Sequence, residues 1–150
     1  MPQSLANILV HLIFSTKNRA AFIRPQIEAE LFPYMATACH SCRCPAHKIG
    51  GTADHVHIVC SVARTVAVAD LMEAVKADSS KWIKTRGAAY AGFAWQNGYG
   101  AFSIGQSQLV AVKRYIEGQK EHHRQHTFQD EYREFLRRYG VQYDERYVWD

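Results

Sequence analysis

Hydrophobic and polar residues alternate along residues 7–15, NILVHLIFS, in the period-two pattern of a β-strand. Over residues 25–38 the apolar positions instead recur every three or four residues, with acidic residues in the first turns, which predicts a helix. A short strand is expected near residues 47–50, and a second one over residues 54–59, DHVHIV. The turn-like Gly50-Gly51-Thr52 between them predicts a hairpin.

Helical spacing returns over residues 68–84, and the segment FAWQNGYGAFSIG, residues 93–105, predicts a last strand with bends at its glycines. Two more helices are expected over residues 107–126 and 129–138. The order predicts an α+β protein with a ferredoxin-like βαββαβ antiparallel sheet, helices on one face and the other face open. The C-terminal helices are then expected to dock elsewhere, with a partner as one option.

Length and composition indicate one globular domain over residues 1–150, because the chain is 47% apolar and 21% charged and has no low-complexity tract. A net charge of +4 leans mildly toward phosphate-rich partners. The longest early apolar run, residues 8–14, is too short to span a membrane, and no basic segment precedes it. We therefore expect a cytoplasmic protein with no membrane partner.

The cysteines are expected to stay reduced in that compartment, so a disulfide framework is not predicted. The segment CHSCRCPAH nevertheless leaves open a structural zinc site, because its spacing resembles that of zinc-binding pairs. Its ligands would be Cys39, Cys42, Cys44 and His47. The alternative is a group of small thiols at a helix end and in the core.

The stretch DHVHIV places His55 and His57 on the same face of a strand, with Val56 and Ile58 on the other. The apolar set is expected to face the helices and the histidines the open side. Two strand rises separate the histidines by roughly 6.6 Å, which allows two imidazoles to converge on one metal ion. Taken alone, the pair is more typical of two surface histidines on a half-exposed strand.

The helix expected over residues 107–126 supplies a second set of polar side chains. At about 100° per residue, Gln119, His122 and His126 fall within about 40° of Tyr115, beside the apolar stripe. The Gln119 amide oxygen offers a third metal ligand. His122 and His126, four residues apart, could instead bind zinc themselves or remain solvated. Gly118 is expected inside this helix, where it costs about 1 kcal/mol relative to alanine.

Five segments in this order resemble the single-tyrosine HUH transposases of bacterial insertion sequences and the related repeat-associated tyrosine transposases. They are HLIFSTKNR, IGGTADHVHIV, VKADSSKWI, WQNGYGAFSIG and YIEGQKEHH. The resemblance extends over nearly the whole chain. It implies a bacterial enzyme of DNA transposition, a metal-dependent single-stranded DNA endonuclease and strand transferase that recognises hairpin DNA.

The resemblance also implies roles for residues and partners. Tyr115 would be the nucleophile, forming a 5′-phosphotyrosine, while His55, His57 and Gln119 would hold a divalent ion. Two imidazoles and an amide oxygen suit Mn²⁺, and Mg²⁺ fits once phosphate oxygens join, so both are candidates. The resemblance further implies a homodimer in which the tyrosine helix of one subunit completes the site of the other.

Basic side chains are candidates for contacts to the DNA backbone or a hairpin stem. They are Lys17, Arg19, Lys76, Lys81 and Lys84. For each of them a merely solvated charge is the alternative. For the whole protein, the alternative is a domesticated member that binds hairpin DNA without cleaving it.

Overall fold

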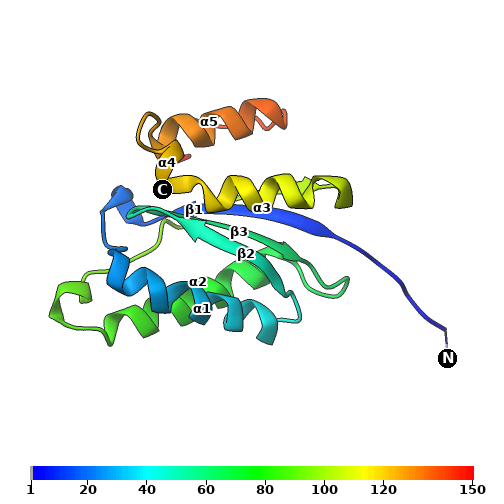
Figure 1. The fold of residues 1–150 in the computed structure, drawn as a ribbon, viewed down its shortest axis with the longest axis horizontal. Coiled ribbons are helices and arrows are strands. Elements are labelled where there is room, and N and C mark those ends of the chain that lie inside the picture. Colours follow the sequence, from blue (N-terminus) through cyan, green and yellow to red (C-terminus); the bar gives the residue numbers. More distant parts are fainter. Residues whose placement is uncertain (1) are drawn as a thin grey trace.

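The computed structural model describes residues 2–150 and has three layers, with a four-stranded sheet in the middle (Figure 1). Two long helices cover one face, α1 (Pro25–Ser41) and α2 (Val68–Lys84). Three shorter helices lie over the opposite face: α3 (Leu109–Glu117), α4 (Gln119–His122) and α5 (Phe128–Arg138). Single 3₁₀ turns occupy Lys17–Arg19, Ala88–Tyr90 and Gln106–Gln108.

The sheet contains β1 (Leu9–Ser15), β2 (Ala46–Gly51), β3 (His55–Ser61) and β4 (Gly100–Ile104). The strands lie in the order β2-β3-β1-β4, and every neighbouring pair is antiparallel. This order and the preceding helices confirm the predicted ferredoxin-like α+β fold. The two central strands, β1 and β3, carry the longest apolar runs, because both of their faces are covered.

Apolar side chains from alternate strand positions form the main core against α1 and α2. Leu12, Phe14, Val56, Ile58 and Cys60 are fully buried on this face, as the alternation predicts. The helices contribute the side chains that recur at helical spacing: Leu31, Met35, Leu71, Met72 and Val75.

The other face of the sheet is not open, and this part of the prediction was wrong. Helices α3, α4 and α5 of the same chain cover it (Figure 1). They do so because α5 has an apolar stripe of its own, which packs on Ile13 and Phe102 of the sheet. That stripe consists of Phe128, Tyr132, Phe135 and Leu136. The C-terminal helices therefore need no partner to bury their apolar side.

The helix expected over residues 107–126 is interrupted at Gly118, where φ is −88° and ψ is 13°. Hydrogen bonds continue through the break, since Gly118 N donates to the Arg114 carbonyl and His122 N donates to the Gly118 carbonyl. A break is favoured at this position because glycine has a low helix propensity. The break separates Tyr115, on α3, from Gln119, at the start of α4.

A second glycine allows α3 to approach the sheet closely. A Cβ atom on Gly50 of β2 would lie 2.6 Å from the main-chain oxygen of Ile116, so a larger residue would push α3 away. Within residues 2–150, no helix is long and apolar enough to cross a membrane.

Candidate functional site

The candidate site begins with the two histidines of β3. His55 and His57 project from the same face, with ring centroids 5.2 Å apart, as their spacing predicts. Both side chains are 0% exposed, because α4 and α5 close over them. A surface role for the pair is therefore excluded.

Gln119 from α4 reaches the first of these histidines. Its Oε1 lies 2.9 Å from His55 Nε2, while its Nε2 donates a hydrogen bond of 3.0 Å to Glu131 Oε2. The second bond fixes the orientation of the amide, so that the oxygen faces the histidines. Gln119 is 1% exposed, and the structure thus brings it to the place where the sequence predicts a third ligand.

Tyr115 lies beside the same group, in the same chain. Its hydroxyl donates a hydrogen bond to Glu131 Oε2, and its ring centroid is 5.7 Å from that of His57. Burial and the Glu131 carboxylate together raise the pKa of Tyr115 above its usual value. The four residues predicted from β3 and the tyrosine helix are therefore neighbours, although their roles stay predictions.

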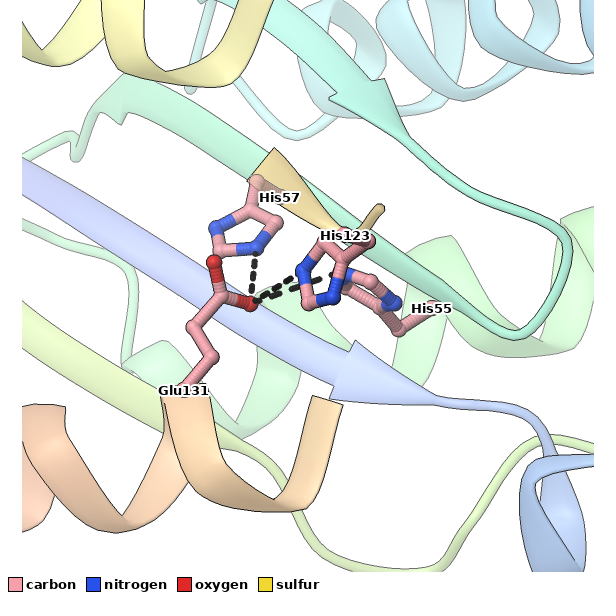
Figure 2. A group of neighbouring side chains, drawn as sticks. All are labelled: His55, His57, His123 and Glu131. Atoms are coloured by element: carbon pink, nitrogen blue, oxygen red, sulfur yellow. Dashed lines mark hydrogen bonds and ion pairs between the residues drawn. The ribbon is translucent and has the colours of Figure 1, made fainter. Parts of the chain in front are cut away.

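Two residues that the sequence did not reveal stand at the centre of the group, Glu131 and His123 (Figure 2). Glu131 Oε1 lies 2.9 Å from His57 Nε2, 3.1 Å from His123 Nε2 and 3.4 Å from His55 Nε2. The carboxylate is 4% exposed and comes from α5, 74 positions after His57. No local pattern identifies it, since the helix reaches the site only by tertiary packing.

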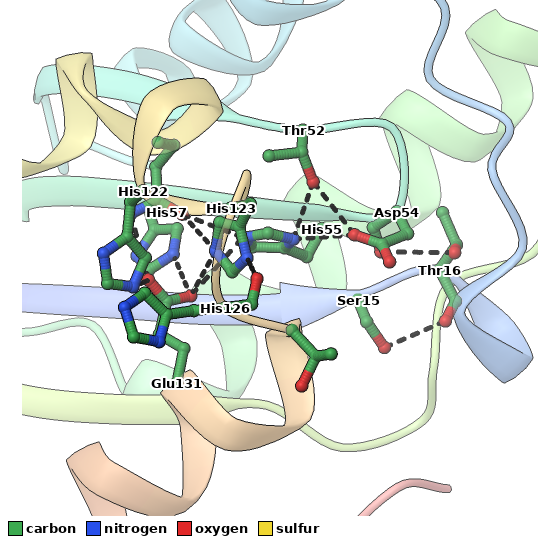
Figure 3. A network of polar contacts seen from close by, with 12 residues as sticks. Ser15, Thr16, Thr52, Asp54, His55, His57, His122, His123, His126 and Glu131 are labelled. Carbon is green, nitrogen blue, oxygen red and sulfur yellow. Dashed lines mark hydrogen bonds and ion pairs between the residues drawn. The ribbon is translucent and has the colours of Figure 1, made fainter.

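Further polar groups hold the outer nitrogens of the rings (Figure 3). His55 Nδ1 lies 2.8 Å from Asp54 Oδ1 and 2.9 Å from Thr52 Oγ1, and His57 Nδ1 lies 2.8 Å from His11 Nε2. Ring orientation is therefore set from behind, as is usual for histidines that bind metals. Among residues 2–150, every buried side-chain nitrogen and oxygen has a hydrogen-bond partner.

Electrostatics follow from this arrangement. Burial alone would lower the pKa of His55, but hydrogen bonds with Asp54 and Glu131 outweigh it and raise that pKa to about 9. Burial would raise the pKa of Glu131, yet its bonds with the surrounding histidines hold that pKa well below the usual value. Burial lowers the pKa of His11 to about 3. The site therefore contains an ionised carboxylate among imidazoles.

The chemistry of this donor set fits a divalent metal ion. Imidazole nitrogens from His55, His57 and His123 and a Glu131 oxygen all lie within 4.8 Å of one another. Three imidazoles and a carboxylate are common metal ligands, and the amide oxygen of Gln119 adjoins them.

A pocket of about 760 Å³ opens between α3 and α5, with Tyr115 and Glu131 in its lining. Its wall is partly apolar, with Val112 and Phe135, and partly basic, with Arg138. Tyr115 and Glu131 thus lie where the buried group meets an accessible space.

The predicted DNA-contacting residues are scattered, and one of them, Lys76, has hydrogen bonds within the chain. Lys76 is not a free surface charge, since its ammonium donates to the carbonyls of Gln96 and Gly98 at 2.8 and 2.6 Å. Burial lowers the pKa of Lys76 to about 8. The Lys76 ammonium thus joins α2 to the loop before β4 by hydrogen bonds.

The other four basic residues have different surroundings. Lys81 and Lys84 are exposed on α2, in the layer on the far side of the sheet from the histidines. Lys17 is exposed in the turn after β1, and the Arg19 guanidinium lies 5.8 Å from the Trp149 ring centroid.

The zinc alternatives receive no support from the geometry of residues 2–150. Only His55, His57, His123 and Glu131 meet there as a metal-ligating group. Burial raises the pKa of Cys39 to about 12, and His47 Nε2 instead lies 2.7 Å from Ser61 Oγ. The rings of His122 and His126 stack on each other, with centroids 4.7 Å apart.

The fold and the site together define an α+β protein with a ferredoxin-like sheet whose second face carries a buried histidine and carboxylate group beside a tyrosine. Residues 4–119 match the family described as IS200-like transposases, so the chain belongs to this family. This finding confirms the resemblance in the sequence and supports a function in DNA transposition. The matched segment includes His55, His57, Tyr115 and Gln119 and ends before His123.

Two solved structures are similar in fold. A proposed transposase from Deinococcus radiodurans has 17% identity and a TM-score of 0.62, over 79% of this chain and 98% of that one. A REP-associated tyrosine transposase bound to a REP hairpin has 10% identity and a TM-score of 0.56, over 79% of this chain and 72% of that one. No curated protein sequence matches the chain.

Proposed function

We propose that the protein cleaves and rejoins single-stranded DNA through a covalent bond to Tyr115. The observation that carries this proposal is the position of the Tyr115 hydroxyl. It lies against Glu131, which also contacts His55, His57 and His123, and it lines the pocket between α3 and α5. The hydroxyl therefore lies where the buried histidine and carboxylate group meets the pocket.

The proposed step is an in-line displacement at a phosphodiester. The Tyr115 oxygen bonds to phosphorus, the bond to the 3′-oxygen breaks, and the 3′-oxygen takes a proton from solvent. Glu131 orients the Tyr115 hydroxyl by accepting its hydrogen bond, and the hydroxyl proton passes to solvent at the pocket. A divalent ion, Mg²⁺ or Mn²⁺, would supply Lewis-acid stabilisation of the phosphoryl oxygens. The products are a 5′-phosphotyrosine and a free 3′-hydroxyl, and the reverse reaction rejoins strands.

The DNA is proposed to enter by the pocket beside Tyr115. Its apolar wall suits a base, and the exposed Arg138 at its edge suits a phosphate. We further propose hairpin DNA as the substrate, in line with the neighbour of similar fold that is bound to a REP hairpin. Lys17, Arg19, Lys81 and Lys84 remain candidates for contacts to its stem.

An adduct assay tests the proposed reaction. Single-stranded DNA from the regions that flank the gene is incubated with protein and Mn²⁺, and covalent complexes are separated on a denaturing gel. We expect an adduct with the wild type and with Tyr147→Phe, an exposed tyrosine, but none with Tyr115→Phe. An adduct that survives Tyr115→Phe contradicts the assignment. Hairpin binding without cleavage in any divalent ion would favour the domesticated binder.

A mixing experiment tests whether Tyr115 acts within its own chain, as its contact with Glu131 favours. Tyr115→Phe and His57→Ala proteins are inactive separately on our proposal. If each tyrosine serves its own site, the mixture stays inactive, because no chain holds both residues. Recovery of adduct formation would instead support the homodimer with exchanged tyrosine helices that the resemblance implies.

A further inference from the structure

We propose that His123 and Glu131 are metal ligands in addition to His55 and His57, and that this four-residue set selects a transition-metal ion such as Mn²⁺ or Co²⁺ over Mg²⁺. The proposal deepens the proposed function, on which its catalytic meaning rests. Both added residues follow the segment 4–119 that matches the family, so the family match assigns them nothing.

Hydrogen bonds to the Nδ1 atoms of His55 and His123 determine which ring nitrogen is free to bind a metal ion. His55 Nδ1 meets the Asp54 carboxylate at 2.8 Å, and His123 Nδ1 meets the His126 carbonyl at 2.6 Å. Both partners are acceptors, so each Nδ1 carries the hydrogen of its ring. In the neutral rings, Nε2 of His55 and of His123 is then left with a lone pair.

These lone pairs face side-chain oxygens of Gln119 and Glu131. His123 Nε2 lies 3.0 Å from Gln119 Oε1 and 3.1 Å from Glu131 Oε1, and His55 Nε2 lies 2.9 Å from Gln119 Oε1. The bond from Gln119 Nε2 to Glu131 fixes that amide oxygen in place. With these rings neutral, lone pairs of nitrogen and oxygen thus converge from several sides, an arrangement that positive charge between them stabilises. A divalent cation supplies this charge to all the donors at once.

The types of ligand in the site determine which divalent ion it prefers. Mg²⁺ prefers oxygen ligands and keeps several waters, whereas imidazole suits later divalent ions. With His123 included, the site offers three imidazole nitrogens and one carboxylate oxygen, all from side chains at most 10% exposed. The set is therefore richer in nitrogen than the two histidines and one amide that the resemblance implies.

Glu131 has a second contact that gives this set a consequence for the nucleophile. Its Oε1 faces the three imidazoles, while its Oε2 accepts the hydrogen bond from the Tyr115 hydroxyl. The carboxylate therefore joins the ion-binding group to the tyrosine. Glu131 lies on α5, so the position of that helix governs whether the set is complete.

Metal affinity measures the proposal directly, without DNA. Calorimetric titration with MnCl₂, with CoCl₂ and with MgCl₂ is compared for wild type, Glu131→Gln and His123→Ala. We expect Mg²⁺ to bind the wild type at least about tenfold more weakly than Mn²⁺, and each variant to lose about tenfold or more in Mn²⁺ affinity. The matched controls are Glu134→Gln on the exposed side of α5 and His126→Ala, whose side chain lies outside the set. Both should bind Mn²⁺ as the wild type does.

A second measurement uses the wild-type chain and does not depend on the folding of any variant. Zn²⁺, used as a diamagnetic stand-in ion, is expected to shift the ring Nε2 signal of His123 as strongly as those of His55 and His57, and to leave that of His47 on β2 unchanged. Mn²⁺ affinities of Glu131→Gln and His123→Ala within twofold of wild type, or an unshifted His123 Nε2 signal, would overturn the proposal. If the variants lose Mn²⁺ affinity as expected but the wild type forms no DNA adduct, the metal ligands are supported and only the proposed function is contradicted.

Discussion

The two faces of the sheet are both buried, yet they are stabilised differently. On the α1 and α2 face, the buried strand residues are apolar, including Leu12, Phe14 and Ile58. On the α3 to α5 face, an aromatic cluster surrounds buried polar groups, and His55, His57 and Glu131 replace what would otherwise be core. The first face gains stability from apolar burial, whereas the second places groups that are costly to bury unless each has a partner.

The helices that cover the second face are short. The helix that carries Tyr115 ends at Glu117, and α4 spans only Gln119–His122. These segments hold side chains at the site more than they add apolar surface, so we expect this layer to be the less stable one. A layer of this kind is suited to local opening, which DNA would need to reach the buried group.

The largest effect on stability is expected on the apolar face. Phe14→Ala removes a fully buried ring from the core against α1 and α2, and should lower the free energy of unfolding by about 3–5 kcal/mol. Chemical denaturation monitored by circular dichroism measures this change. Leu5→Ala, at a residue that is 86% exposed, is the control and should change stability by less than about 0.5 kcal/mol. Equal effects of the two would refute the assigned core.

A smaller effect is expected on the polar face. Glu131→Gln keeps the shape of the side chain but removes the charge that the surrounding histidines contact, and should cost about 2 kcal/mol in metal-free buffer. Denaturation in the presence of a chelator isolates this contribution. Glu134→Gln, exposed on the same helix, should cost less than about 0.5 kcal/mol. If the two substitutions are equivalent, the carboxylate is not a stabilising centre of this face.

The smallest effect is expected at the start of α5. Thr127 Oγ1 accepts a hydrogen bond of 3.1 Å from Asp130 N, which caps the helix that carries Glu131. Thr127→Ala should therefore lower stability by about 1 kcal/mol, while Thr127→Ser keeps the hydroxyl and most of the stability. Hydrogen exchange should show faster opening of α5 in Thr127→Ala and unchanged protection of α1. Uniform loss of protection in both helices would contradict independent layers.

The apolar face was predictable from sequence because its signals are local. Alternation over residues 7–15 and helical spacing over residues 25–38 identify the elements and the side that each buries. The strand order then follows from the sequence of elements. The histidine pair, and the pair of Tyr115 and Gln119, were also visible, since the members of each pair are close in sequence. The roles that join the two pairs came from the resemblance to the transposase family.

The remainder of the polar face depends on contacts between distant segments. Glu131 lies 74 positions from His57, and nothing in the sequence around α5 distinguishes it from its exposed neighbour Glu134. The covering of the second face and the internal role of Lys76 likewise arise from packing. The helix break at Gly118 was missed because a glycine inside a helical pattern indicates a cost and not a definite interruption.

The proposed bond between DNA and Tyr115 is tested by identifying the residue that becomes linked to DNA. Wild-type protein is reacted in Mn²⁺ with single-stranded DNA from the regions that flank the gene, digested with nuclease and protease, and analysed by mass spectrometry. We expect a nucleotide linked through a 5′-phosphate to the peptide that contains Tyr115, and no other modified peptide. A nucleotide on another residue, or cleaved DNA with no modified peptide, would contradict it.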